Sequence, residues 1–226
     1  MSAPVKIDVF SDYLCPWCYN AAVRLEEIEE TYGERVRIAW RAFPLIPDEH
    51  PGRVATAKTQ EGRHRVGAEE PRALFVAPDI GAPLPASSMP ALVAAKCAER
   101  QGDAAFQAFH RRLFLAHFRD NLDIGRPEAL WQVARESALD MARFERDYAA
   151  GDAYQAALTD YAEGAAWFGV SAVPAAVFNE KISLVGAVSV ERYQAILDWI
   201  LAGEPGGIVP LPADPSEAGA TRLGAA

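Results

Sequence analysis

The sequence is short of cysteine, of positive charge and of long apolar runs, and each shortage excludes a class of protein. Three cysteines among 226 residues are too few for a scaffold built from disulfides. The chain has 22 Lys and Arg against 31 Asp and Glu, a net charge of −9, so its surface repels phosphate backbones and anionic lipids. No uncharged apolar run approaches the roughly 20 residues that cross a bilayer. We therefore expect neither a nucleic-acid partner nor a membrane partner.

The N-terminal segment also lacks the pattern of a secretory signal. It has no basic stretch followed by a long apolar one, so the expected location is the cytoplasm. Half of the residues are hydrophobic and 23% are charged, which suits a folded core and excludes disorder of most of the chain. The length fits one large domain or one domain with an insertion.

Short apolar strand patterns flank a long stretch with helical patterns only. The first part reads as a strand over 5–10, a helix over 16–32 and a strand over 36–43, which is a right-handed parallel crossover unit. Between residues 53 and 168 helical spacing predicts helices over 53–71, 88–101, 103–118, 127–137, 139–149 and 152–168. Strand patterns return at 173–178 and 181–186, before a last helix over 190–202.

The predicted fold class is therefore α/β, in the order β-α-β, helical insertion, β-β-α. The segments 1–52 and 166–203 should form the sheet domain and 53–165 the insertion. The tail over 204–226 is rich in Pro, Gly and Ala and is expected to be extended. An apolar stripe at helical spacing predicts a packed interior for the insertion: Phe106, Phe109, Leu113, Phe114 and Phe118.

Two of the three cysteines stand in the motif Cys15-Pro16-Trp17-Cys18, where a strand gives way to a helix. Unpaired amides and the helix dipole at a helix N-terminus would stabilise a thiolate at Cys15. Pro16 suits the first helical position because its φ is preset and it needs no hydrogen bond there. Cys18, one turn later, should point inward and react less. This asymmetry is what dithiol exchange requires: one thiolate attacks and its buried partner resolves the mixed disulfide.

Other interpretations of this motif are weaker. A structural zinc site needs four ligands, and the sequence has no second CxxC and no close Cys/His pair, so we expect no metal. A purely structural disulfide would close too short a loop to restrict the unfolded chain much. Cys97 has the helical spacing of a small core residue.

Several polar residues are further candidates. Asp8 lies in a predicted central strand, where a carboxylate is costly, and could exchange a proton with Cys18; the alternative is a solvated position near the strand end. Asp12 is expected to be a loop carboxylate. His110 and His117 are seven residues apart on one helix, too far for a shared metal ion, and are expected at the helix edge. Trp17 should be an exposed aromatic contact for substrate.

The Val173-Pro174 pair begins a predicted strand, a position that tolerates proline. From the residues alone a trans peptide bond is the default.

Together, CPWC at the start of a helix, a helical insertion and a downstream Val-Pro resemble the DsbA-like thioredoxin-fold oxidoreductases. Within them the chain is most similar to the FrnE branch, described as dithiol-disulfide or polyketide-type isomerases. The similar segments are SDYLCPWCYN, WRAFPLIP and GVSAVPAAVFN, and the resemblance covers about residues 5–202.

The resemblance implies a thioredoxin-like fold and assigns roles within it. Cys15 matches the attacking cysteine and Cys18 the resolving one. Pro174 matches a cis-proline that faces the dithiol, and Val173 would pair its backbone with an extended substrate. Asp8 matches the acidic residue of the first strand, with one extra residue before the motif. Trp17 replaces the histidine of periplasmic DsbA, which argues against very strong oxidising power.

These expectations lead to a thiol-disulfide oxidoreductase or isomerase that acts on a disulfide-containing protein or small molecule. We expect no resident cofactor, although glutathione or another low-molecular-weight thiol could serve as co-substrate. One alternative is a thiol-dependent isomerase or transferase like 2-hydroxychromene-2-carboxylate isomerase or kappa-type glutathione transferase, but these relatives usually carry serine at the position of Cys15. Another is a non-enzymatic binding module with a vestigial dithiol. The oligomeric state is left open.

Overall fold

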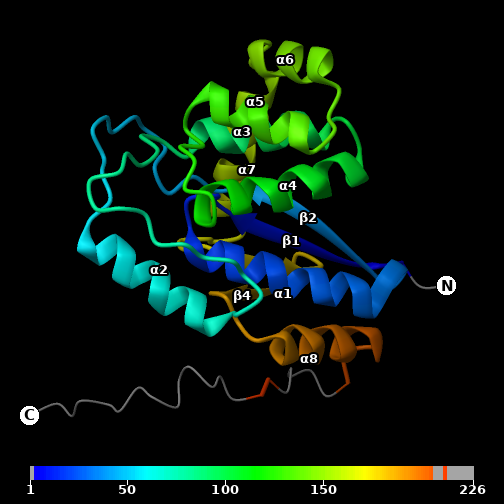
Figure 1. Ribbon diagram of the computed structural model, residues 1–226. Coiled ribbons are helices and arrows are strands. Elements are labelled where there is room, and N and C mark those ends of the chain that lie inside the picture. The colour runs from blue at the N-terminus through cyan, green and yellow to red at the C-terminus, as the bar shows by residue number, and fades with distance from the viewer. Residues whose placement is uncertain (1–2, 206–210, 213–226) are drawn as a thin grey trace, which may run out of the picture.

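The computed structural model describes residues 3–205 and 211–212, and its centre is a four-stranded sheet in the order β2-β1-β3-β4 (Figure 1). The strands are β1 (Val5–Ser11), β2 (Val36–Ala42), β3 (Ala175–Phe178) and β4 (Ile182–Val185). β1 and β2 are parallel, and the other neighbouring pairs are antiparallel. β1 therefore lies inside the sheet, between β2 and β3. The CPWC segment follows the carboxyl end of β1.

Helices cover both faces of this sheet. α1 (Pro16–Tyr32) packs against α8 (Val190–Leu201), and the two share a buried cluster with Ile7 and Val9 of β1. α7 (Asp152–Ala166) covers the opposite face, where a Cβ on Gly164 would lie 2.6 Å from a ring carbon of Phe10. Since alternate residues of a strand point to opposite faces, odd-numbered side chains of β1 face α1 and even-numbered ones face α7.

The insertion stacks above the sheet in Figure 1, apart from α2, which lies beside α1. Its helices before α7 are α2 (Ala57–Glu69), α3 (Met89–Glu99), α4 (Asp103–Phe118), α5 (Pro127–Glu136) and α6 (Met141–Ala149). A short 3-10 turn, η1 (Gly33–Arg35), joins α1 to β2. The α/β fold with a helical insertion is confirmed. Among the described residues, no helix has the length and apolar character to span a bilayer.

The apolar stripe of α4 is buried, as predicted. Four of its five members are at most 2% exposed and Phe106 is 9% exposed. The rings of Phe114 and Phe118 stack on Tyr19 of α1, with centroids 5.2 and 5.6 Å apart. The insertion and the sheet domain thus share one core, and the stripe forms part of their contact. The division at residues 52/53 and 165/166 stays a prediction, and the predicted tail lies mostly outside the described residues.

The helix predicted from residue 53 begins four residues later. Thr56 and Thr59 form a capping box, which satisfies backbone groups at the start of α2 and fixes its first residue as Ala57. The preceding residues pair instead with a later loop: the Leu84 N–H donates to the Arg53 carbonyl at 2.9 Å, and the Ala55 N–H to the Ala82 carbonyl at 2.8 Å. This pairing holds Arg53 near the start of α2.

Arg24 of α1 links its helix to two other segments of the chain. Its Nε donates to Glu70 Oε2 at 3.0 Å, and its Nη1 donates to the carbonyls of Ala187 and Val188, ahead of α8. Arg72 also donates to Glu70. Burial by itself would raise the pKa of Glu70, but the hydrogen bonds from Arg72 and Arg24 outweigh it, and the pKa falls to about 2.

The depressed pKa of Glu70 predicts a pH-dependent contribution to stability. The contribution is fully present above about 4.5, the ordinary pKa of a glutamate, and is lost as the pH falls toward 2. In urea unfolding, the wild type should therefore exceed Glu70→Gln in free energy of unfolding by an amount that shrinks below pH 4.5. Glu61→Gln, which removes an exposed carboxylate of α2, is the matched control. A wild-type advantage that stays constant from pH 7 to pH 3 would contradict this account.

Candidate active site

The two cysteines of the motif occupy the first turn of α1. Cys15 is the N-cap residue, and its Sγ accepts a hydrogen bond from the Cys18 N–H at 3.3 Å. Pro16 takes the first helical position, as predicted. Both sulfurs are reduced and well covered: Cys15 is 4% exposed and Cys18 is fully buried. Cys15 is therefore less exposed than the sequence suggested, although it remains the outer one of the pair.

The Val173-Pro174 peptide bond is cis, as the resemblance implied and the residues alone did not. This pair lies against the dithiol although 158 positions separate it from Cys15 in the sequence: the Cys15 thiol donates to the Val173 carbonyl at 3.7 Å. The long separation is bridged by the pairing of β1 with β3, which begins one residue after Pro174.

Cys18 has the surroundings of a resolving thiol. Burial raises its pKa well above the ordinary value, and the neighbouring Cys15 sulfur raises it further. The Ser11 hydroxyl and the Asp12 backbone N–H, which are within hydrogen-bonding reach, oppose this rise. Cys18 is therefore protonated at neutral pH. Cys97, buried in α3, has its pKa raised to about 12 by burial and is held away from this chemistry in the core, as predicted.

Asp8 lies elsewhere than predicted. It is 2% exposed, but its side chain points to the α7 face of the sheet, whereas Cys18 belongs to the α1 face. Its partners there are Lys6 Nζ at 2.9 Å and Arg41 Nη1 at 4.0 Å. Arg41 in turn binds Asp160 and Glu163 of α7. Strand alternation therefore makes Asp8 part of an ion-pair network, and Ser11 is the β1 residue that approaches Cys18.

Asp12 is buried in the loop before Cys15 and accepts hydrogen bonds from three segments of the chain. Its carboxylate accepts hydrogen bonds from the Leu14 N–H at 2.7 Å, the Leu45 N–H at 2.6 Å and the Ser88 hydroxyl at 2.5 Å. Burial raises its pKa, while these hydrogen bonds oppose the rise. Asp12 therefore fastens the loop before Cys15 to the segments after β2 and before α3.

The two histidines of α4 are buried, contrary to the helix-edge position expected for them. Burial lowers the pKa of each to about 3, so both are neutral at physiological pH. His110 Nδ1 lies 2.7 Å from the Tyr13 hydroxyl, and His117 Nε2 lies 3.5 Å from Arg63 Nη2. The sequence could not reveal these partners because Tyr13 and Arg63 come from other elements.

Two hollows are lined by residues that neighbour the dithiol. A groove of about 740 Å³ is lined by Trp17, Val173 and Pro174 together with Arg24, Glu70 and the start of α8. Trp17 is half-buried rather than exposed, and it forms a wall of this groove. A smaller pocket of about 240 Å³ borders Leu14 and Pro16. No cluster of three or more potential metal ligands occurs in the part of the chain that the structure describes.

Comparison with known proteins identifies the family of the fold. Residues 6–198 match the family model of the DSBA-like thioredoxin domain. The chain belongs to this family.

Among curated proteins, a ClpXP adapter protein SpxH from Bacillus licheniformis is 27% identical over 212 residues, which cover 89% of this chain and 69% of that protein. A probable DsbA oxidoreductase from Streptomyces coelicolor has a similar structure, with a TM-score of 0.71 and 23% identity over 92% of this chain and 93% of that one. The cytosolic disulfide reductase DsbM from Pseudomonas aeruginosa, solved with glutathione, has a TM-score of 0.63 and 19% sequence identity. The match covers 87% of this chain and 99% of that one. Both structural likenesses support the DsbA-like fold.

Proposed function

We propose that the chain is a thiol-disulfide oxidoreductase or isomerase of the FrnE type, in which Cys15 attacks and Cys18 resolves. The observation that carries the proposal is the arrangement of the two sulfurs. Cys15 caps a helix N-terminus with the Val173 carbonyl beside it, while the protonated Cys18 is fully buried. A substrate disulfide can reach only the outer sulfur.

The proposed reaction proceeds in two exchanges. The Cys15 thiolate attacks one sulfur of a substrate disulfide, forms a mixed disulfide and expels the other sulfur as a thiolate, which takes up a proton. Cys18 then loses its proton and attacks Cys15, which forms the Cys15–Cys18 disulfide and releases the second substrate thiol. The protein dithiol is oxidised by two electrons and the substrate disulfide is reduced to two thiols. The reverse sequence oxidises a substrate dithiol.

The groove beside Pro174 is suited to an extended substrate. Val173 lines this groove next to the Cys15 sulfur, and an extended peptide could pair with its backbone as an added strand. Trp17 supplies an apolar wall at the same place. The proposed substrates are disulfide-containing proteins or small disulfides. The fold needs no resident cofactor for this chemistry, and glutathione is a candidate co-substrate because DsbM, a protein of similar structure, has been solved with it.

The proposed location is the cytoplasm. DsbM is described as a cytosolic disulfide reductase, and a reducing compartment would regenerate the Cys15–Cys18 dithiol after each turnover.

Replacing Cys18 tests the assignment of roles. A Cys18→Ala variant should form a stable mixed disulfide at Cys15 when treated with oxidised glutathione, because no neighbouring thiol can release it. The wild type should instead accumulate the intramolecular disulfide with no adduct. Intact-protein mass spectrometry and peptide mapping distinguish the two products. Cys97→Ala is the matched control and should behave like the wild type. An adduct on Cys97, or no adduct in Cys18→Ala, would contradict the proposal.

A second candidate is a binding module of the adapter kind. It is favoured by the curated relatives named SpxH, described as ClpXP adapter proteins, whose similarity covers 89% of this chain. For such a module, replacement of Cys18 would leave partner binding unchanged and no mixed disulfide would form. The same mass measurement therefore separates the two candidates.

A further inference from the structure

The smaller hollow beside the dithiol differs from the rest of the surface in its charge. Arg53, Lys58 and Arg63 line it, and no Asp or Glu does. These three cations have no carboxylate oxygen within 4.0 Å among the described residues, whereas the arginines of the groove on the Trp17 side, Arg24 and Arg72, are paired with Glu70 and Glu27. For a chain with a net charge of −9, a pocket lined by three cations and by no carboxylate is unusual.

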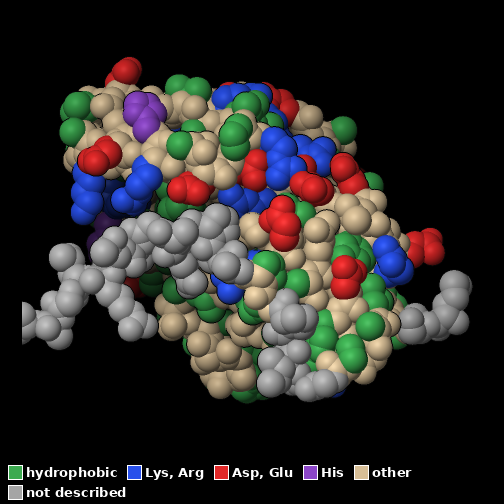
Figure 2. Space-filling view, turned by 90° about the horizontal axis from the view of Figure 1, so that it is seen from below, with side chains coloured by type: hydrophobic (Ala, Val, Ile, Leu, Met, Phe, Trp, Pro, Cys, Tyr) green, Lys and Arg blue, Asp and Glu red, His purple; other side chains and the backbone are tan. Residues whose placement is uncertain are grey.

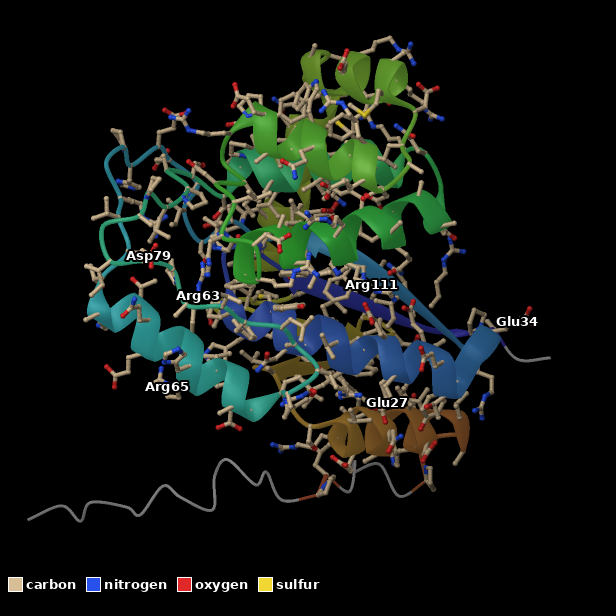
Figure 3. All side chains as sticks on the ribbon, viewed as in Figure 1. Glu27, Glu34, Arg63, Arg65, Asp79 and Arg111 are labelled. Atoms are coloured by element: carbon tan, nitrogen blue, oxygen red, sulfur yellow. The ribbon has the colours of Figure 1, made fainter. Side chains whose placement is uncertain are left out.

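Arg63 is the most deeply buried of these three cations. It is only 5% exposed, and Figure 3 places it on the side of α2 that faces α1 and α4, with Arg65 on the outer side of the same helix. Its Nη1 donates to the Val76 carbonyl at 2.9 Å and to Asn121 Oδ1, and its Nη2 lies 3.5 Å from His117 Nε2. All of these partners are neutral, since burial keeps His117 unprotonated. A buried guanidinium without a counter-charge is costly in a protein interior.

The other two cations stand nearer to solvent at the mouth. Arg53 is half-buried and its Nη1 donates to the Pro85 carbonyl, which fixes its position beside the pocket. Lys58 is exposed in the first turn of α2. On the face shown in Figure 2, Lys and Arg side chains lie among Asp and Glu side chains, both at the left end and over the middle. Asp79, on the loop above α2 in Figure 3, is exposed and does not line the pocket.

The positively charged pocket lies beside the segment that carries Cys15. Leu14 and Pro16, which flank Cys15 in the sequence, form part of its wall. A volume of about 240 Å³ holds one small group rather than a whole peptide.

We propose that this pocket binds an anionic group, a carboxylate or a phosphate, of a low-molecular-weight disulfide that Cys15 attacks. The inference rests on the proposed thiol-disulfide exchange and names its substrate class: acidic disulfides are preferred over neutral or cationic ones. The bound anion supplies the counter-charge that Arg63 lacks, and Arg53 and Lys58 complete its coordination with charge-assisted hydrogen bonds. The negative surface elsewhere would otherwise disfavour such substrates.

The test compares disulfides of different charge. The second-order rate of oxidation of the reduced protein is measured at low ionic strength with oxidised glutathione, coenzyme A disulfide, bis(2-hydroxyethyl) disulfide and cystamine. Lys58→Gln should slow the two acidic disulfides by at least roughly tenfold, the lower end of the effect of one hydrogen bond to a charged group. It should leave the neutral disulfide unchanged, and Lys58→Arg should restore the rate. A larger loss with coenzyme A disulfide assigns the pocket to phosphate, and a larger loss with glutathione assigns it to carboxylate.

Arg65→Gln is the matched control, because it removes an exposed cation from the outer side of the same helix. It should leave all four rates unchanged. Inorganic phosphate should inhibit the reaction of the wild type with the acidic disulfides and inhibit Lys58→Gln less.

Equal losses for acidic and neutral disulfides, no loss with Lys58→Gln, or the same loss with Arg65→Gln would overturn the inference while leaving the exchange chemistry in place. If none of the four disulfides oxidises the Cys15–Cys18 pair, the proposed function itself fails.

Discussion

Replacing Cys15 by serine should abolish thiol-disulfide exchange, with a loss of rate on the order of a thousandfold or more. The reason is chemical: the thiolate is the nucleophile, and a serine hydroxyl stays protonated near neutral pH. The N-cap position would survive, since a serine oxygen can accept the hydrogen bond that the Cys18 N–H now donates to Cys15 Sγ. The fold should therefore persist while the activity disappears.

The measurement is the rate of reduction of a small disulfide such as oxidised glutathione, followed by release of thiol, with circular dichroism as the check on folding. Cys97→Ala is the matched control, because Cys97 is buried in α3 and lies outside the site. It should keep the wild-type rate. A folded Cys15→Ser protein that still exchanges disulfides would show that Cys15 is not the attacking residue.

The largest loss of stability is expected for Phe114→Ala. Phe114 is fully buried and its ring contacts Tyr13 and Tyr19, with centroids 4.8 and 5.2 Å away. Truncation removes the ring from the core that the insertion shares with α1 and leaves a cavity, which should cost about 3–5 kcal/mol.

Urea unfolding measures this cost as the change in free energy of unfolding. Ile80→Ala is a suitable control, since Ile80 is 65% exposed and its truncation should change stability by less than about 0.5 kcal/mol. A loss below about 1 kcal/mol for Phe114→Ala would mean that α4 does not pack as the structure has it.

The fold could be predicted because its local signals agree with one another. Strand 5–10 has alternating β-branched residues, Pro16 and Gly33 mark the ends of α1, and the apolar stripe of α4 has helical spacing. The two cysteines could be found for the same reason: their spacing and their place at a strand-to-helix junction are local properties.

The rest of the site depends on tertiary geometry. Asp8 points to the α7 face because even-numbered residues of β1 lie on that face. The sequence alone does not show which face of the strand α7 covers and which α1 covers. His110 and His117 were expected at the helix edge, but both are buried. The sequence could not show this because their partners, Tyr13 and Arg63, lie 97 and 54 positions away. The cations of the pocket beside Pro16 come from the loop before α2 and from α2 itself, and only the folded chain brings them to the dithiol.

The central claim is that Cys15 and Cys18 form one redox-active pair, and equilibration of the full chain in glutathione redox buffers tests it most directly. At each ratio of reduced to oxidised glutathione, thiols are blocked by acid quenching and alkylation, and peptide mapping gives the fraction of each cysteine oxidised. The account predicts a single two-electron transition in which Cys15 and Cys18 become oxidised together as an intramolecular disulfide while Cys97 stays reduced throughout. The account would be contradicted if both cysteines stayed reduced at every ratio, or if the disulfide formed involved Cys97.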